Sequence, residues 1–189
     1  MIDIKNIDPR IRTALIIRHG DRELIPVGEF GNEIPINETG KKNAINFGRS
    51  IRNIPINHIF SSPIPRCVQT ANCIVQGNNY EIPITETKSL GDPGLHIDDE
   101  IVAGKFYLEC GFDEMYRKFC ADEYVPGVPS PSEFKNRMDL FIKMNTKKEG
   151  ITIFITHDSI IAFYDYCLTG KIYTKENWIP YLTGIIKSF

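Results

Sequence analysis

The hydrophobic positions of this chain fall into short continuous runs, which alternate with segments of helical periodicity. Aliphatic and β-branched residues dominate the short runs, and this is typical of buried strands. Five such runs predict strands at residues 13–17, 57–61, 81–85, 151–155 and 184–189.

The segments between these runs predict helices. Apolar residues recur at helical spacing over residues 38–52, 98–109, 113–120 and 158–168. Two further helices are predicted to start at Ser62-Pro63 and at Ser130-Pro131, since serine caps a helix and proline suits its first turn.

Alternating strands and helices predict an α/β fold, in which a mostly parallel sheet carries helices on both faces. No repeat or linker divides the chain, so we expect one domain over residues 1–189 with an insertion at about 88–127. The long polar segment 21–37 is expected to be a functional loop, because structureless loops of this length are uncommon in compact domains.

The bulk composition narrows the classes of partner. The chain has 189 residues and a net charge of −2, which predicts affinity for neither nucleic acid nor membrane. Met1–Lys5 shows no basic region followed by a long apolar stretch, so no signal peptide is expected. With five cysteines, an odd number, reduced thiols and a cytoplasmic location are expected.

Polar side chains follow two of the predicted strands directly. Arg18-His19-Gly20 follows the run at 13–17, and Thr156-His157-Asp158 follows the run at 151–155. Arg66 lies just after a third junction between strand and helix. Since the carboxyl ends of parallel strands meet at one edge of a sheet, we expect these residues to lie close together.

This set suits phosphoryl transfer. Guanidinium groups match the geometry of phosphoryl oxygens, so Arg18, Arg22 and Arg66 are candidates for holding a phosphate. A neutral imidazole is a competent nucleophile near pH 7, which points to His19 and a phosphohistidine intermediate. His157 is placed to donate to a phosphoryl oxygen, and a carboxylic acid must protonate the leaving group.

Three motifs resemble the histidine phosphatase superfamily, which includes cofactor-dependent phosphoglycerate mutases, fructose-2,6-bisphosphatases and histidine acid phosphatases. They are Arg18-His19-Gly20, the segment 61–71 and Thr156-His157-Asp158. The resemblance implies a phosphoglycerate mutase-like three-layer sandwich. It also implies that His19 is the phosphorylated nucleophile and that Arg18, Arg66 and His157 bind the phosphoryl group.

The acid that protonates the leaving group has more than one candidate. Arg18-His19-Gly20-Asp21-Arg22 and His157-Asp158 are similar to the RHGxR and HD motifs of the acid phosphatases, which implies Arg22 as a phosphate ligand and Asp158 as the acid. Leu24 departs from that pattern, where proline is usual. The short chain resembles the mutases, whose acid lies between the second and third motifs, and this favours Asp92 or, less well placed, Glu86. We favour Asp158.

The sequence therefore predicts a phosphatase for a phosphorylated small molecule or protein, with no metal or organic cofactor. A phosphomutase is the nearest alternative, because it shares the phosphohistidine chemistry. A non-catalytic module that binds phosphorylated ligands is another, and a metal site at His157-Asp158 is disfavoured because the pair follows an apolar strand. The oligomeric state and the physiological substrate stay open.

Overall fold

The computed structural model describes residues 7–26 and 29–189. Met1–Lys5, on which the expectation about a signal peptide rests, and residues 27–28 of the predicted loop lie outside these residues. Within them, one sheet has the strand order β3-β2-β4-β1-β5. Its strands are β1 (Arg12–Arg18), β2 (Ile56–Ser61), β3 (Ile84–Glu86), β4 (Gly150–Thr156) and β5 (Gly184–Ser188).

The sheet is mostly parallel, as predicted. β1, β2, β3 and β4 run parallel to one another, whereas β5 pairs antiparallel with β1 at the edge of the sheet. β3 begins at Ile84, later than predicted. Pro83 precedes it and has no N–H to donate to a neighbouring strand, which limits pairing there.

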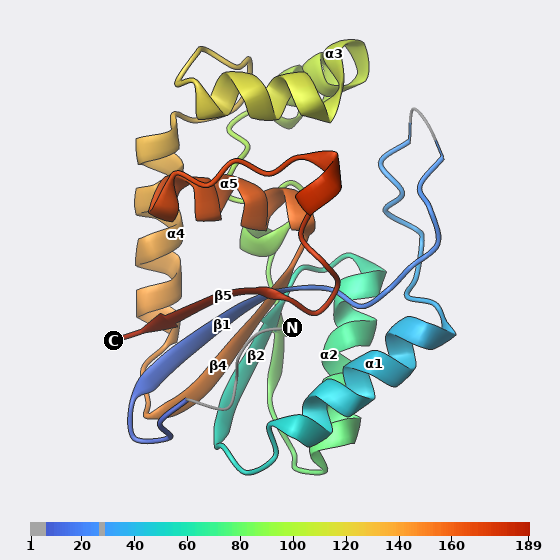
Figure 1. Cartoon of the computed structure of the whole chain (residues 1–189), viewed down its shortest axis with the longest axis vertical. Coiled ribbons are helices and arrows are strands. Elements are labelled where there is room, and N and C mark those ends of the chain that lie inside the picture. The colour runs from blue at the N-terminus through green and yellow to red at the C-terminus, as the bar shows by residue number, and fades with distance from the viewer. Residues whose placement is uncertain (1–6, 27–28) are drawn as a thin grey trace.

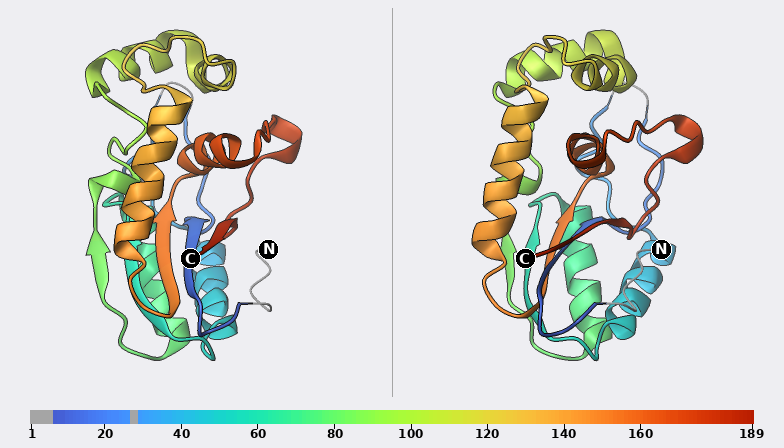
Figure 2. Two further views of the ribbon diagram at one scale, coloured as in Figure 1. Left: turned by 90° about the vertical axis from the view of Figure 1, so that its left-hand side faces the viewer. Right: turned by 60° about the vertical axis from the view of Figure 1, so that its left-hand side comes forward.

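Helices cover both faces of the sheet (Figures 1 and 2). They are α1 (Glu38–Ser50), α2 (Pro65–Asn78), α3 (Glu100–Cys120), α4 (Pro131–Asn145) and α5 (Asp158–Thr169), with 3-10 turns η1 (Lys88–Leu90) and η2 (Lys175–Asn177). Successive side chains of β1 point to opposite faces of the sheet. Leu15 and Ile17 pack against α1 and α2 on one face, and Ala14 and Ile16 pack against the other helices on the second face. This is the predicted three-layer sandwich.

Two predicted helix boundaries differ from the structure. α2 begins at Pro65 rather than Pro63, because the Ser62 hydroxyl accepts from the Ile64 N–H and also bonds the His157 ring, so it caps no helix. The two helices predicted over 98–120 form one element, α3, which is interrupted at Gly111 by a non-helical φ of 79°. This segment lies above the sheet, at the top of Figure 1.

α1 and α2 cross at two glycines, which let their backbones touch. A Cβ atom on Gly77 would lie 1.9 Å from the Ile45 carbonyl oxygen, and one on Gly48 would lie 2.2 Å from the carbonyl oxygen of Ile74. Only residues without a side chain allow this approach. The close crossing fixes α2, whose first turn carries Arg66, relative to the sheet.

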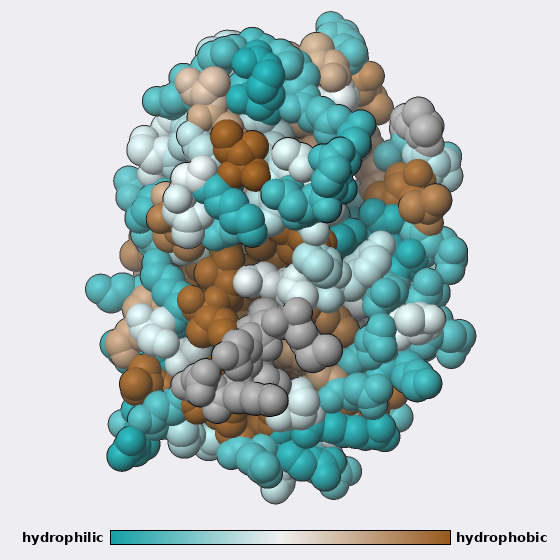
Figure 3. All heavy atoms as spheres, viewed as in Figure 1, coloured by the Kyte–Doolittle hydropathy of each residue, from teal (hydrophilic) through white to brown (hydrophobic). Residues whose placement is uncertain are grey.

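Hydrophilic side chains cover much of the face seen in Figure 3, and apolar ones gather across its middle. Across residues 7–26 and 29–189, no helix combines the length and the apolar character needed to cross a membrane.

Candidate active site

Three segments bring the candidate residues together at one edge of the sheet. β1 and β4 pair in parallel, with Arg18 opposite Thr156, so His19 and His157 leave neighbouring strands at the same level. The two imidazole rings lie 5.6 Å apart between centroids. The first turn of α2 adds Arg66, which contacts both rings. The convergence predicted from the sequence is confirmed.

The hydrogen bonds of His19 fix its tautomer. Its ring is almost fully buried, with 1% of the residue exposed. Arg66 Nε donates to His19 Nε2 at 3.2 Å, so Nε2 must be the acceptor nitrogen. Nδ1 then carries the proton and donates to the Gly20 carbonyl oxygen at 2.8 Å. The lone pair of Nε2 therefore lies on the side of the ring that faces Arg66.

His157 is fixed in the opposite tautomer. Arg66 Nη2 donates to its Nδ1 at 3.1 Å, so Nε2 carries the proton. That proton is donated to Ser62 Oγ at 3.0 Å. One guanidinium thus holds both histidines, and its Nη1 also donates to the Gly31 carbonyl oxygen at 2.7 Å, which fastens the 21–37 loop to the site.

Both histidines are held neutral. Burial, together with the positive charges of Arg66 and Arg18, lowers the pKa of His19 to about 3. Burial also lowers the pKa of His157 well below its ordinary value, with Arg66 and His19 adding to the effect. A neutral imidazole keeps the lone pair that a nucleophile needs, so His19 is suited to attack across the physiological pH range.

Arg18 lies behind the site rather than in its wall. Its Nη2 pairs with Asp158 Oδ2 at 2.8 Å, and its Nη1 donates to the Ile179 carbonyl oxygen at 2.5 Å. The guanidinium carbon lies 3.9 Å from the centroid of the Tyr181 ring. Arg18 is absent from the residues that line the pocket. Its clearest role in this arrangement is to hold Asp158, and direct contact with a phosphoryl group stays a prediction.

Asp158 is half-buried beside the two histidines and is ionised. Its Oδ2 accepts from Trp178 Nε1 at 2.9 Å as well as from Arg18, and its Oδ1 accepts from the Ser159 N–H. Burial alone would raise its pKa, but Arg18 and the Trp178 hydrogen bond outweigh that and leave the pKa below its ordinary value. The carboxylate is therefore a ready base, and it must take up a proton before it can act as an acid.

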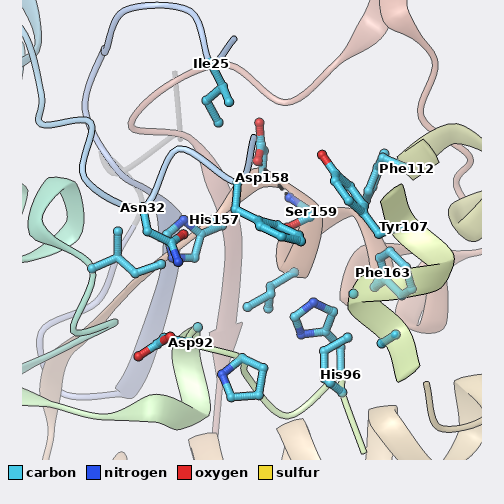
Figure 4. Close-up of a pocket in the computed structure, with 18 of the residues that line it drawn as sticks. Ile25, Asn32, Asp92, His96, Tyr107, Phe112, His157, Asp158, Ser159 and Phe163 are labelled. Atoms are coloured by element: carbon cyan, nitrogen blue, oxygen red, sulfur yellow. Dashed lines mark hydrogen bonds between the residues drawn. The ribbon is translucent and has the colours of Figure 1, made fainter. Parts of the chain in front are cut away.

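The competing carboxyl groups differ in position. Asp92 lines the pocket from the loop after η1, with 45% of its side chain exposed and Lys88 Nζ 3.6 Å away. It approaches from a different side than Asp158 (Figure 4). Glu86 is exposed at the end of β3 and does not line the pocket. The geometry keeps Asp158 and Asp92 as candidates.

Arg22 lines the pocket, as expected for a phosphate ligand. Its Nη1 donates to the Glu23 carbonyl oxygen at 2.7 Å. Its Nε is buried and has no hydrogen-bond partner among the described residues. A buried donor without a partner is costly, which favours a ligand that accepts from it.

Several residues that support the site were missed from the sequence. Thr70 Oγ1 accepts from the Gly20 N–H at 2.9 Å and donates to the Arg66 carbonyl oxygen at 2.7 Å, so it joins the first motif to the second. Gln69 Oε1 accepts from the Ile36 N–H at 3.0 Å and ties down the loop. Gln69 and Thr70 could have been found from their place beside Arg66 in the motif at 61–71, whereas no pattern in the sequence marks Trp178.

The site opens into a pocket of about 530 Å³. Tyr107, Phe112, Phe163 and His96 gather on one side of it, and His157 lies on the other (Figure 4). Of the aromatic residues of α3, Tyr107 and Phe112 line the pocket, whereas Phe106 and Tyr116 do not. His96, from the loop before α3, is also part of the wall.

Lowering the pH from 7 to 5 should reduce the free energy of unfolding. Unfolded histidines bind protons around pH 6.5, whereas His19 and His157 stay neutral in the folded protein, so the unfolded state takes up more protons. Each contributes up to about 1.4 kcal/mol per pH unit below the unfolded pKa. Urea unfolding at pH 7, 6 and 5 measures the slope, and His19→Gln should make it shallower. A flat profile would contradict the neutral assignment.

Comparison with known proteins agrees with this geometry. The family model of the histidine phosphatase superfamily (branch 1) matches residues 14–179. Fructose-2,6-bisphosphatase TIGAR B of Danio rerio is 30% identical over 135 residues, 68% of this chain and 51% of that protein. A 2,3-bisphosphoglycerate-dependent phosphoglycerate mutase of Thermoplasma acidophilum is 26% identical over 84% of this chain and 77% of that protein.

The solved structures support the fold. A phosphoglycerate mutase from Bacillus anthracis str. Sterne superposes with a TM-score of 0.59 and 19% identity, covering 95% of this chain and 92% of that one. The chain spans about half or less of the length of the first curated relatives that it matches. The three motifs converge at one site and the family model matches most of the chain, so the chain belongs to the histidine phosphatase superfamily, branch 1.

Proposed function

We propose that this chain is a phosphatase that hydrolyses a phosphomonoester through a covalent phosphohistidine on His19. The observation that carries the proposal is the fixed tautomer of His19. His19 Nδ1 carries the proton and donates it to the Gly20 carbonyl oxygen, and the lone pair of Nε2 faces the Arg66 guanidinium. A nucleophile beside a bidentate donor for phosphate is the arrangement that in-line phosphoryl transfer needs.

Substrate binding frees the nucleophile in this scheme. The phosphoryl oxygens accept from Arg66, which gives up its bonds to His19 Nε2 and His157 Nδ1. Arg22 offers its unpartnered Nε from the pocket wall. These donors gain strength as charge spreads over the oxygens in the transition state.

Two displacements complete the reaction. The substrate binds as its monoanion and passes its proton to the Asp158 carboxylate. His19 Nε2 attacks phosphorus, the ester P–O bond breaks, and the departing oxygen takes that proton from Asp158. Water then attacks phosphorus, the P–N bond breaks, Asp158 takes a proton from the water, and His19 returns to its neutral form. Asp158 releases that proton to solvent as phosphate leaves, which restores the carboxylate. Asp158 is the acid we favour because it lines the pocket beside the histidines and is less exposed than Asp92, which is the alternative.

Rapid-quench labelling tests the proposal. The protein is mixed with a ³²P-labelled aryl phosphate in the presence of a chelator, quenched, and assayed for labelled protein and free phosphate. We expect an acid-labile, base-stable phosphoenzyme that turns over to inorganic phosphate. Label that passes only to a second hydroxyl compound, with no phosphate released, would instead identify a mutase. Release of phosphate without any phosphoenzyme would contradict the covalent route.

A further inference from the structure

We propose that the leaving group of the substrate is apolar or aromatic, and that it occupies the aromatic part of the pocket beside His19. This inference rests on the proposed function, and it names the substrate class for the same site. The pocket has two chemically different parts. The phosphoryl end is lined by His19, Arg22, Arg66 and His157.

The other part is apolar and lies under α3. It is lined by Ala103, Tyr107, Phe112, Met115, Ile160 and Phe163. Ala103 and Met115 of this wall are buried, as are Ile160 and Phe163. Burial of an apolar group here removes its surface from water. A sugar would bury several hydroxyls, and this wall offers few polar atoms to replace their water hydrogen bonds. These are chiefly the Tyr107 hydroxyl and His96 Nδ1, which has no hydrogen-bond partner among the described residues.

The charges in the wall disfavour a second phosphate. Among the described lining residues, the arginines are Arg22 and Arg66, both assigned to the phosphoryl end. The other charged lining residues are carboxylates: Asp92, Glu100 and Asp158. His96 adds no positive charge, because burial lowers its pKa to about 4. A bisphosphate would therefore place its second anionic group beside carboxylates, and the cation next to Asp92, Lys88, lies outside the lining and is already 3.6 Å from Asp92 Oδ2.

An aromatic contact connects two of the segments that line the pocket. Phe30 of the 21–37 loop stacks on Tyr107 of α3, with ring centroids 5.2 Å apart and planes at 28°. Both side chains line the pocket. The contact joins the loop to α3 across the site, which suits a compact small molecule better than a folded phosphoprotein surface.

Gly104 offers a way to fill this part of the pocket without disturbing the core. It lines the pocket from α3, and a Cβ atom built on it meets only Phe30 Cζ, at 3.9 Å. Leucine is also a better helix former than glycine. Gly104→Leu therefore projects a side chain into the space that the leaving group would take.

The test compares benzyl phosphate with methyl phosphate and fructose 2,6-bisphosphate. Benzyl and methyl phosphate both release a simple alkoxide, so the chemical step is matched and the difference reports the pocket. We expect kcat/KM for benzyl phosphate to exceed that for methyl phosphate roughly 10- to 100-fold, mostly through KM, as burial of a phenyl ring predicts. Fructose 2,6-bisphosphate should be no better than methyl phosphate.

Gly104→Leu should reduce the preference for benzyl over methyl phosphate by about tenfold or more, since it replaces the bound ring. Leu108→Ala removes an exposed apolar side chain from the same helix outside the pocket and should leave the preference unchanged. Equal kcat/KM values for the three substrates, or a preference that Gly104→Leu does not alter, would overturn the inference while leaving the phosphatase proposal intact.

Binding of phosphonates separates the two proposals if no ester is hydrolysed. Benzylphosphonate and methylphosphonate cannot be cleaved, and calorimetry gives their affinities and heat-capacity changes. Tighter binding of benzylphosphonate with a more negative heat-capacity change supports the apolar pocket even where turnover fails. Equal affinity and equal heat-capacity change would overturn it.

Discussion

Replacing His19 by alanine is expected to lower kcat for aryl phosphate hydrolysis by at least about 10⁴-fold, because the covalent route loses its nucleophile. No other described residue offers an unprotonated nitrogen beside Arg66 apart from His157, whose ring is held by Ser62 through Nε2. The label in the quench experiment should disappear in the same variant. Steady-state assay and rapid quench measure the two effects on one preparation.

Two controls separate chemistry from folding in that variant. His58→Gln changes a histidine on β2 that does not line the pocket, so its activity should match the unchanged protein. Inorganic phosphate should still bind to His19→Ala, because Arg66 and Arg22 remain. Turnover above about 1% of the unchanged protein in His19→Ala would overturn the nucleophile assignment, since loss of a covalent nucleophile costs far more.

The sequence predicted the layers of the fold because two strands of the sheet, β1 and β4, are buried on both faces. Leu15 and Ile17 serve one core and Ala14 and Ile16 the other, so β1 has no polar side and appears as a continuous apolar run. The parallel-sheet rule then placed His19 and His157 at the same edge. The apolar runs, the polar residues that follow them and the rule for parallel sheets were therefore sufficient to predict that residues far apart in the chain lie close together.

The direction of a side chain could not be predicted in the same way. Arg18 carries the expected charge at the expected strand end, yet its guanidinium turns to Asp158, the Ile179 carbonyl and the Tyr181 ring. Two of these partners lie in the segment between α5 and β5, which has no motif. Trp178, which donates to Asp158, comes from the same segment. Such contacts depend on how an irregular segment returns over the sheet, and no local pattern encodes that path.

Asp158→Asn is expected to have the second largest effect, and the effect should depend on the leaving group. For an alkyl phosphate such as benzyl phosphate, loss of a general acid should lower kcat about 10²- to 10⁴-fold. For p-nitrophenyl phosphate the loss should be much smaller, because a nitrophenolate leaves without a proton. Asparagine keeps an oxygen that can accept from Trp178, so the local contacts are disturbed as little as the chain permits.

The pH dependence of the unchanged protein sharpens this prediction. The pKa of Asp158 lies below its ordinary value in the free protein, so the carboxylate is ionised above about pH 4. The proton for the leaving group must then arrive with the substrate monoanion, whose last ionisation falls near pH 6, by analogy with other phosphate esters. We therefore expect kcat/KM for alkyl phosphates to fall about tenfold per pH unit above roughly pH 6, by mass action.

Asp92→Asn is the matched control, because it changes a second pocket carboxylate that has no contact with Arg18 or Trp178. If Asp158 is the acid, Asp92→Asn should keep both the alkyl phosphate activity, within about tenfold, and the decline above pH 6. If instead Asp92→Asn loses alkyl phosphate turnover and Asp158→Asn does not, the acid is Asp92. Arg18 would then serve to hold a structural ion pair with Asp158, and the likeness of His157-Asp158 to the acid phosphatase motif would carry no catalytic meaning in this chain.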